Sequence, residues 1–170
     1  MARSDADLPV TQPLIDRLVD RDQDRDRDRS IPLSDPYRTR SASVRGLKAA
    51  LRRDLEWLLN TRRDPNAAPE SMAELSQSLF NYGLPDFSAL SVNSPKDRQQ
   101  LLVEIERTVA IFEPRLRNVR VTLIEGSGVG TRAVRFQIEG SLQMDPSPEH
   151  ISFDGELQLA NGEYQIRGER

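Results

Sequence analysis

The clearest hydrophobic pattern in the first half of the chain has the period of an α-helix. From Ser41 onward, apolar residues recur three and four positions apart, which places them on one stripe of a helix. The residues of this stripe are Val44, Leu47, Leu51, Leu55 and Leu58, and Trp57 and Leu59 widen it. Two prolines in the stretch from Asn60 to Pro69 then predict a loop.

Two further helices are predicted between this loop and the middle of the chain. Ser71 and Glu74 have the spacing of a capping box, which predicts a short second helix ended by Gly83. The apolar residues of that helix are Met72, Leu75 and Leu79. Ser94 is a suitable N-cap for a third helix, and Pro114 should end it near Glu113. Its apolar stripe consists of Leu101, Leu102, Ile105, Val109 and Phe112.

After Arg115 the hydrophobic period changes from that of a helix to that of a β-strand. Apolar and polar residues alternate in successive short runs, and the apolar positions are Val119, Val121, Leu123, Val134, Phe136, Ile138, Leu142, Met144, Ile151, Phe153, Leu157, Leu159, Tyr164 and Ile166. Gly126–Gly130 reads as a turn or loop, and Asn161-Gly162 is a two-residue hairpin signal. Helices followed by strands predict an α+β fold, with about three amphipathic helices packed on a C-terminal antiparallel β-meander of three to four strands.

The first forty residues read as a segment outside the domain. Leu14, Ile15, Leu18 and Val19 suit a short helix that docks on the domain or on a partner. Asp20–Ser30 has alternating charges and nothing apolar to bury, which predicts a flexible linker within residues 20–30. The expected organisation is therefore an N-terminal segment over residues 1–40 and one α+β domain over residues 41–170.

Composition narrows the classes of function. The chain has 24 Lys and Arg residues against 27 Asp and Glu, a net charge of −3, whereas a dedicated nucleic-acid-binding protein is usually basic. Cysteine is absent, which excludes disulfides and thiolate zinc sites and makes the cytoplasm the default compartment. No apolar run reaches the length of a membrane span, and the N-terminus lacks the apolar core of a signal peptide.

The charges are unevenly distributed, which leaves room for a binding surface. Arg38–Arg63 contains eight basic and two acidic residues, a pattern that fits either an acidic partner or a solvated helix face. A nucleic-acid adaptor using Arg45, Lys48 and Arg52 is a weaker alternative, because the chain is acidic overall and has few aromatic residues. We expect no nucleic-acid partner.

Residues that could carry catalysis form no specific constellation. His150 is the single histidine, so we expect neither a metal site nor a catalytic histidine. The glycines of Gly126–Gly130 lack the spacing of a phosphate-binding loop. A pair of carboxylates, as in glycosidases, could join Glu113 with Asp145, Glu149 or Asp154, but any acidic chain offers such pairs. We expect no enzyme activity, no catalytic residue and no cofactor.

The tripeptide Glu113-Pro114-Arg115 is the strongest candidate for a binding site. It links the last predicted helix to the first predicted strand, and the proline fixes the backbone between two opposite charges. Arg115 can fork onto a carboxylate of a partner, and Glu113 can accept hydrogen bonds. A simple helix stop with two solvated charges is the alternative reading.

Several segments in this order resemble one family of proteins. They are Leu14–Leu18, Ser43–Arg45, Leu58–Asn60, Asn81–Phe87, Ile105-Glu106, Ile111–Leu116, Phe136–Gly140, and Pro148-Glu149 with Phe153. Their order and spacing resemble TssE, the baseplate component of the bacterial type VI secretion system, and the wider family of lysozyme-like baseplate wedge proteins of contractile-tailed phages. The resemblance covers roughly residues 12–18 and 41–167, and the linker carries no part of it.

The resemblance implies a structural subunit of a cytoplasmic baseplate that docks on the inner membrane. It implies binding to the two large wedge subunits, with Glu113, Pro114 and Arg115 at that interface, and docking of contractile sheath subunits by strand exchange with the sheet. Through the baseplate it implies contact with the spike hub and the membrane-complex adaptor, without insertion into the membrane. The family's lysozyme label leaves a peptidoglycan-cleaving muramidase as the alternative. Which edge of the sheet meets the sheath is left open by the sequence.

Overall fold

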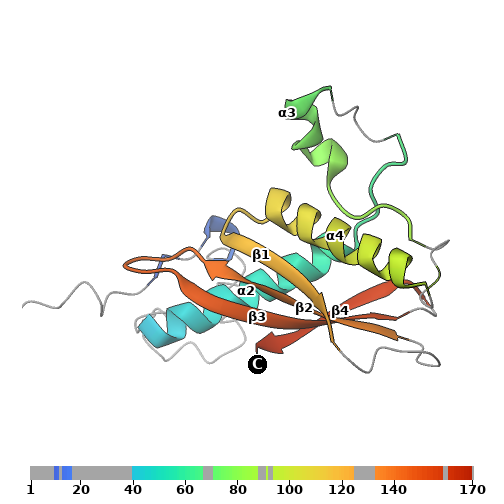
Figure 1. The fold of residues 1–170 in the computed structure, drawn as a ribbon. Coiled ribbons are helices and arrows are strands. Elements are labelled where there is room, and N and C mark those ends of the chain that lie inside the picture. The colour runs from blue at the N-terminus through green and yellow to red at the C-terminus, as the bar shows by residue number, and fades with distance from the viewer. Residues whose placement is uncertain are drawn as a thin grey trace, which may run out of the picture. The chain divides into compact units, whose positions relative to one another are not determined.

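A computed structural model describes most of the chain (Figure 1): residues 10–11, 13–16, 40–66, 71–87, 91, 94–124, 133–158 and 161–169. The chain divides into two compact units. One comprises Met1–Leu51 and Met144–Ser147, and the other comprises Arg52–Gln143 and Pro148–Arg170. The longest helix, α2 (Arg40–Asn60), begins in one unit and ends in the other. None of the helices in the described ranges combines the length and the apolar character needed to cross a membrane.

In the first unit, the start of α2 is tied to the N-terminal segment. The Ser43 hydroxyl accepts a hydrogen bond from the Val10 N–H at 2.9 Å and donates one to the Arg40 carbonyl at 2.8 Å. Residues 14–16 form a single helical turn, in which Asp16 is buried while Leu14 and Ile15 are 69% and 66% exposed. The rest of the predicted apolar segment and the predicted linker Asp20–Ser30 lie outside the described residues.

The second unit contains a four-stranded antiparallel sheet in the order β1-β2-β3-β4. The strands are β1 (Leu116–Leu123), β2 (Ala133–Leu142), β3 (Glu149–Gln158) and β4 (Glu163–Glu169). Each strand pairs with the next in sequence, so the predicted meander and the α+β class are confirmed. Met144 lies beyond the end of β2, although the alternating pattern predicted it as part of that strand.

One face of the sheet contributes 11 of the 22 buried apolar side chains in the described residues. Ile138 on β2 pairs with Val121 on β1 and Phe153 on β3, and all three side chains are buried. Gly155 pairs with Phe136, and a Cβ at Gly155 would collide with the Phe136 ring, so a side chain there would displace this aromatic residue. The alternation predicted from the sequence therefore reflects one buried and one polar sheet face.

The helix α4 (Pro95–Phe112) has the predicted boundaries. The Ser94 hydroxyl accepts a hydrogen bond from the Asp97 N–H, as an N-cap does, and Pro95 occupies the first helical position. Four residues of the predicted apolar stripe are buried: Leu101, Leu102, Ile105 and Val109. The helix ends at Phe112, two residues before Pro114, because a proline disfavours helical backbone at the residue before it.

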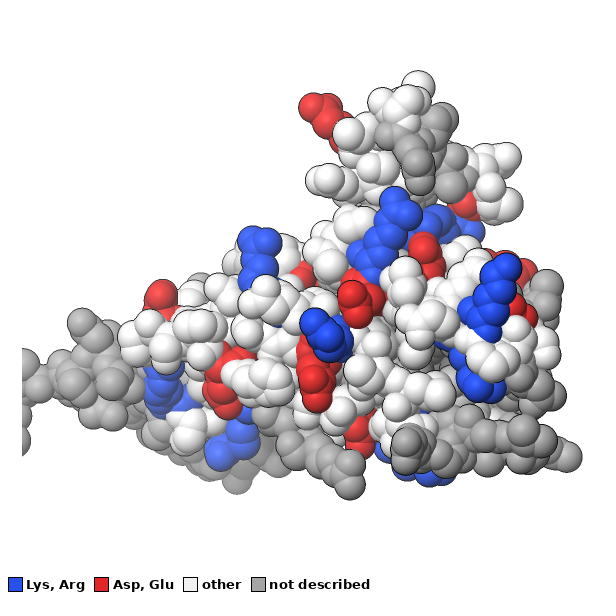
Figure 2. Space-filling model, in the orientation of Figure 1, with Lys and Arg blue, Asp and Glu red and all other residues white. Residues whose placement is uncertain are grey.

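The predicted second helix is wrong in length, cap and burial. The structure has a four-residue helix, α3 (Ala73–Ser76), followed by the 3₁₀ turn η3 (Leu79–Asn81), and Ser71 does not cap α3. The Ser76 and Ser78 hydroxyls donate to carbonyls three residues earlier, a local alternative that competes with helical hydrogen bonds. Met72, Leu75 and Leu79 are exposed. We call the segment that carries α3 and η3 the excursion, and Figure 2 shows it as mainly uncharged surface.

Two smaller predictions also fail. Trp57 is 60% exposed and packs its ring against the Arg53 guanidinium at 5.0 Å, instead of widening the buried stripe of α2. The connection between β3 and β4 contains four residues, because Gln158 pairs with Glu163. Gly162 in this connection has φ +69°, so the Asn-Gly signal marks a turn but not a two-residue hairpin.

Candidate functional site

The tripeptide Glu113-Pro114-Arg115 forms the turn between α4 and β1. Glu113 caps the C-terminus of α4, and its N–H donates to the Val109 carbonyl at 2.9 Å. The Leu116 N–H then donates to the Glu113 carbonyl at 3.1 Å, which closes the turn at the first residue of β1. Pro114 is exposed at the outside of this turn. These backbone hydrogen bonds fix the short connection between α4 and β1, and with it the positions from which the Glu113 and Arg115 side chains extend.

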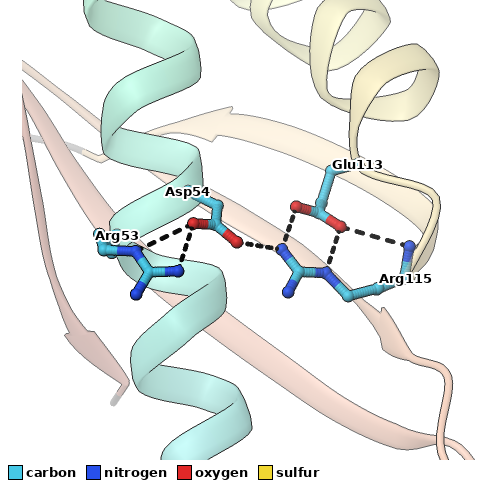
Figure 3. Close-up of polar contacts among 4 residues, drawn as sticks. All are labelled: Arg53, Asp54, Glu113 and Arg115. Atoms are coloured by element: carbon cyan, nitrogen blue, oxygen red, sulfur yellow. Dashed lines mark hydrogen bonds and ion pairs between the residues drawn. The ribbon is translucent and has the colours of Figure 1, made fainter. Parts of the chain in front are cut away.

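The two charged side chains of the tripeptide bind each other (Figure 3). Arg115 donates from Nε to Glu113 Oε1 at 2.6 Å and from Nη2 to Glu113 Oε2 at 2.5 Å, a bidentate ion pair. The same Nη2 donates to Asp54 Oδ2 on α2 at 2.6 Å. Arg53 donates from Nε and Nη2 to Asp54 Oδ1 at 3.1 and 2.9 Å. We call Arg53, Asp54, Arg115 and Glu113 the charge chain.

The charge chain runs from the interior to the surface. The Glu113 side chain is 7% exposed, whereas the Arg115, Asp54 and Arg53 side chains are 24%, 27% and 32% exposed. Hydrogen bonding to Glu113 raises the pKa of Arg115, and this effect exceeds the opposing effect of burial. Opposite charges therefore alternate along the charge chain, and both oxygens of the innermost carboxylate, Glu113, accept hydrogen bonds from Arg115.

An aromatic pair lies beside the charge chain. The rings of Tyr82 and Phe112 meet edge to face, with centroids 5.3 Å apart. Burial raises the pKa of the Tyr82 phenol, and the negative charges of Asp54 and Glu113 raise it further. Asn81–Phe87 and the end of α4, two of the segments in the resemblance, therefore meet at one place in the fold.

The excursion that carries α3 is fixed at its base. The Leu84 N–H donates to the Thr61 carbonyl at 2.9 Å, and the Arg63 N–H donates to the Leu84 carbonyl at 2.8 Å. The Arg63 guanidinium also binds the Gly83 carbonyl and pairs with Glu104 at 2.9 Å. Gly83 has φ +100°, and a Cβ there would collide with the Thr61 carbonyl. Gly83 is therefore required by a close backbone approach, and not as the end of a helix.

Each outer edge of the sheet is partly closed by a helix side chain, a feature that the sequence reasoning missed. On β1, the Val121 N–H donates to Glu106 Oε2 of α4 at 3.0 Å. On β4, the Tyr164 N–H donates to Asn60 Oδ1 at 2.9 Å, and Asn60 Nδ2 donates to the Tyr164 carbonyl at 2.8 Å. The Asn60 amide thus supplies one donor and one acceptor, as a residue of a neighbouring strand does.

The remaining candidate acids lie on other elements. Asp145 is in the turn after β2, Glu149 begins β3, and Asp154 lies in the middle of β3. His150 is exposed on β3. No group of three or more His, Asp or Glu side chains in the described ranges has an arrangement that could hold a metal ion. Among the basic residues considered for nucleic acid, Arg45 and Arg52 are exposed and Lys48 is half-buried.

Comparison with known proteins gives one match. The model of a protein family described as baseplate wedge protein gp25 matches residues 45–147. The matched range contains the whole charge chain, α4, β1 and β2. Searches of curated proteins and of solved structures found no match.

Proposed function

Because the chain belongs to the family of the baseplate wedge protein gp25, we propose that it is a structural subunit of a type VI secretion baseplate. In this proposal it binds the two large wedge subunits and acts as a docking template for polymerisation of the contractile sheath. It works in the cytoplasm, at the baseplate docked on the inner membrane, and reaches the spike hub and the membrane-complex adaptor through that baseplate. The observation that carries the proposal is a family match that includes the complete Glu113-Pro114-Arg115 turn.

The wedge contact is proposed at the outer side of this turn. Glu113 is buried and bonded to Arg115, so its role is to position the arginine and the turn. Pro114 and Arg117 are exposed, and the second terminal nitrogen of Arg115 lies outside the contacts drawn in Figure 3. A rigid, exposed turn binds with little loss of conformational freedom, which suits a permanent interface. In this proposal Glu113 does not contact the partner directly.

The sheath contact is proposed at the outer edge of β4. The other edge strand, β1, has α4 alongside it (Figure 1), a register shift between Arg117 and Arg120, and its Val121 N–H bound to Glu106. On β4, Asn60 binds the outer edge at Tyr164. By the alternation of an antiparallel pair, Ile166 directs its N–H and carbonyl to the same outer side. Strand addition from Ile166 onward therefore extends the existing sheet.

The proposal includes no catalytic step. A muramidase would need a carboxylate able to donate a proton to a glycosidic oxygen. Both oxygens of Glu113, the acid on which that reading depended, accept hydrogen bonds from Arg115. A turbidity assay on purified peptidoglycan tests this part, and activity that is lost in Glu113→Gln would contradict it.

The wedge contact can be tested by co-expression with the two large wedge subunits of the same gene cluster. We expect the tagged wild-type chain to co-purify both subunits, and Glu113→Ala/Arg115→Ala to lose them. Because the double variant also breaks a partly buried ion pair, Pro114→Ala provides a second test that leaves the charge chain intact. Failure of the wild-type chain to retain either subunit would refute the wedge role. Full retention by both variants would refute the role of the turn.

The sheath contact has a matched pair of variants. Ile166→Pro and Ile166→Ala both lose the buried isoleucine side chain, but only the proline removes the outward N–H. We expect sheath subunits to bind and polymerise on the alanine variant and to fail on the proline variant. Circular dichroism and thermal unfolding should be measured for both, so that binding is compared at similar folded fractions. Equal sheath binding by the two variants would argue against strand addition at β4.

A further inference from the structure

Asp154 has a carboxylate oxygen that no group in the described part of the chain satisfies. Its Oδ1 is buried and accepts no hydrogen bond there. The residue lies on β3 between two core positions, Phe153 and Gly155, so its side chain is on the polar face of the sheet. An unsatisfied buried carboxylate oxygen is unfavourable for folding. A residue of this kind calls for an explanation outside the isolated fold.

The neighbouring arginines are held by another acid. Glu156 Oε2 binds Arg167 Nη2 at 3.0 Å and Arg135 Nε at 3.7 Å. Arg135 is directly opposite Glu156 in the β2–β3 register. Two positive charges thus converge on one carboxylate, while Asp154, two residues away on the same face, has an oxygen without a donor among the described residues.

The sheet is irregular opposite Asp154. Phe153 pairs with Glu169 and Gly155 pairs with Ile166, so Arg167 and Gly168 of β4 both lie opposite Asp154. This is a β-bulge on the outer strand, and bulges change where neighbouring side chains point. Beside it is a pocket of about 270 Å³. Its lining residues are Ile124, Arg135, Asp154, Gly155, Glu156 and Arg167.

We propose that this pocket receives a basic side chain, arginine or lysine, from the sheath strand that docks on β4. The inference rests on the proposed sheath contact and identifies the residue that selects the strand. A cationic donor both neutralises Asp154 and supplies the hydrogen bond that Oδ1 lacks, and such charge-assisted bonds are the stronger kind. An added strand lies about 4.8 Å outside β4, so it is roughly 10 Å from β3. Only the long stems of arginine and lysine span that separation.

The test compares Asp154→Asn with Glu139→Gln in the full-length chain. Both substitutions remove one negative charge from the polar face of the sheet and keep the side-chain size. Purified sheath subunits of the same gene cluster are titrated onto each variant at low and high salt. We expect Asp154→Asn to weaken binding about tenfold or more, with a smaller salt dependence, because a hydrogen-bonded charge pair is lost. Glu139→Gln should bind as wild type does.

Thermal unfolding of the free variants distinguishes a binding role of Asp154 from a purely structural one. Since no donor in the described part of the chain satisfies Asp154 Oδ1, Asp154→Asn should unfold at the same or a higher temperature than wild type, although it binds more weakly. A variant that loses stability and binding together would overturn the inference and indicate an internal role.

Charge exchange identifies the partner group. Asp154→Lys should abolish binding, and a glutamate in place of one basic residue of the sheath strand should restore it. If wild type and Asp154→Asn bind the sheath subunits equally well, the inference about Asp154 is wrong, but the proposed sheath contact is not contradicted. Absence of any wild-type binding to sheath would overturn both. The two failures are therefore distinguishable.

Discussion

Glu113 and Asp154 are both carboxylates of the sheet-containing unit, but they differ in how their oxygens are satisfied. Arg115 binds both oxygens of Glu113, and Asp54 and Arg53 extend the contacts to the surface. Asp154 keeps a buried oxygen without a donor in the described part of the chain, although two arginines line the same pocket. Within the residues that the structure describes, the Glu113 site is complete and the Asp154 site is not.

This difference separates residues that shape the domain from residues that remain for a partner. A buried carboxylate whose partner is removed becomes an uncompensated charge, so Glu113 should matter for stability. Asp154 has one buried oxygen that no donor in the described part of the chain satisfies, so replacing this carboxylate should cost little stability. For a protein whose proposed work is assembly, the incomplete site is the more informative one.

The largest effect should come from Glu113→Ala. It leaves Arg115, whose side chain is 24% exposed, without its bidentate partner. We expect the free energy of unfolding, measured by urea denaturation, to fall by about 3 kcal/mol. Glu74→Ala, which removes an exposed acid from α3, is the control and should change it by less than about 0.5 kcal/mol. A loss below about 1 kcal/mol for Glu113→Ala would mean that the charge chain does not stabilise the turn.

Asn60→Ala should have the next largest effect, because the Asn60 amide also completes a contact within the molecule, through uncharged hydrogen bonds. It removes both hydrogen bonds to the Tyr164 backbone. We expect a loss of about 2 kcal/mol and faster hydrogen exchange of the Tyr164 amide. Asn60→Asp keeps the acceptor and loses the donor, so it should protect that amide better than alanine does. Unchanged exchange in Asn60→Ala would show that the side chain does not close this edge in solution.

A smaller effect is expected at the outer end of the charge chain. Asp54→Asn removes the charge between Arg53 and Arg115, where the Asp54 side chain is 27% exposed. Solvent screens this pair more than the Glu113 pair, so the loss should be about 1 kcal/mol. Comparison with Glu113→Ala tests whether the contribution of the charge chain to stability falls from the interior to the surface. Equal losses for the two variants would contradict it.

The smallest effect should appear only at alkaline pH. Burial raises the pKa of Tyr164 above its ordinary value of 10.0, so the folded state keeps the phenolic proton where the unfolded chain loses it. This contribution to stability is fully present below about pH 10 and is lost as the pH rises above it. In Tyr164→Phe the free energy of unfolding should therefore decline less steeply above about pH 10. Parallel declines for variant and wild type would contradict the assigned cause.

Local signals in the sequence were sufficient for α4 and for the meander. Ser94 and Pro95 mark the start of α4, and Pro114 lies two residues after its end. Strict alternation predicted the buried sheet face because its period matches the strand geometry. The excursion with α3 was mispredicted because two serine hydroxyls compete for its carbonyls and its apolar residues find no core.

The sites depended on contacts that no local pattern encodes. Asp54 and Arg115 are 61 positions apart, and Asn60 and Tyr164 are 104 apart. The resemblance included Leu58–Asn60 and Ile105-Glu106, yet gave no role to Asn60 or Glu106 at the sheet edges. The internal pairing of Glu113 with Arg115 could have been suspected from their separation of two residues across a proline turn.

The most direct test of this account compares thermal unfolding of Glu113→Gln and Asp154→Asn in the full-length chain. Each substitution removes one negative charge and keeps the shape of the side chain. We predict a clear fall in the unfolding midpoint for Glu113→Gln, because Arg115 loses its bidentate counter-charge and keeps only Asp54, and an unchanged or higher midpoint for Asp154→Asn. Similar falls in both variants would contradict the distinction between a site completed within the molecule and a site left open for a partner.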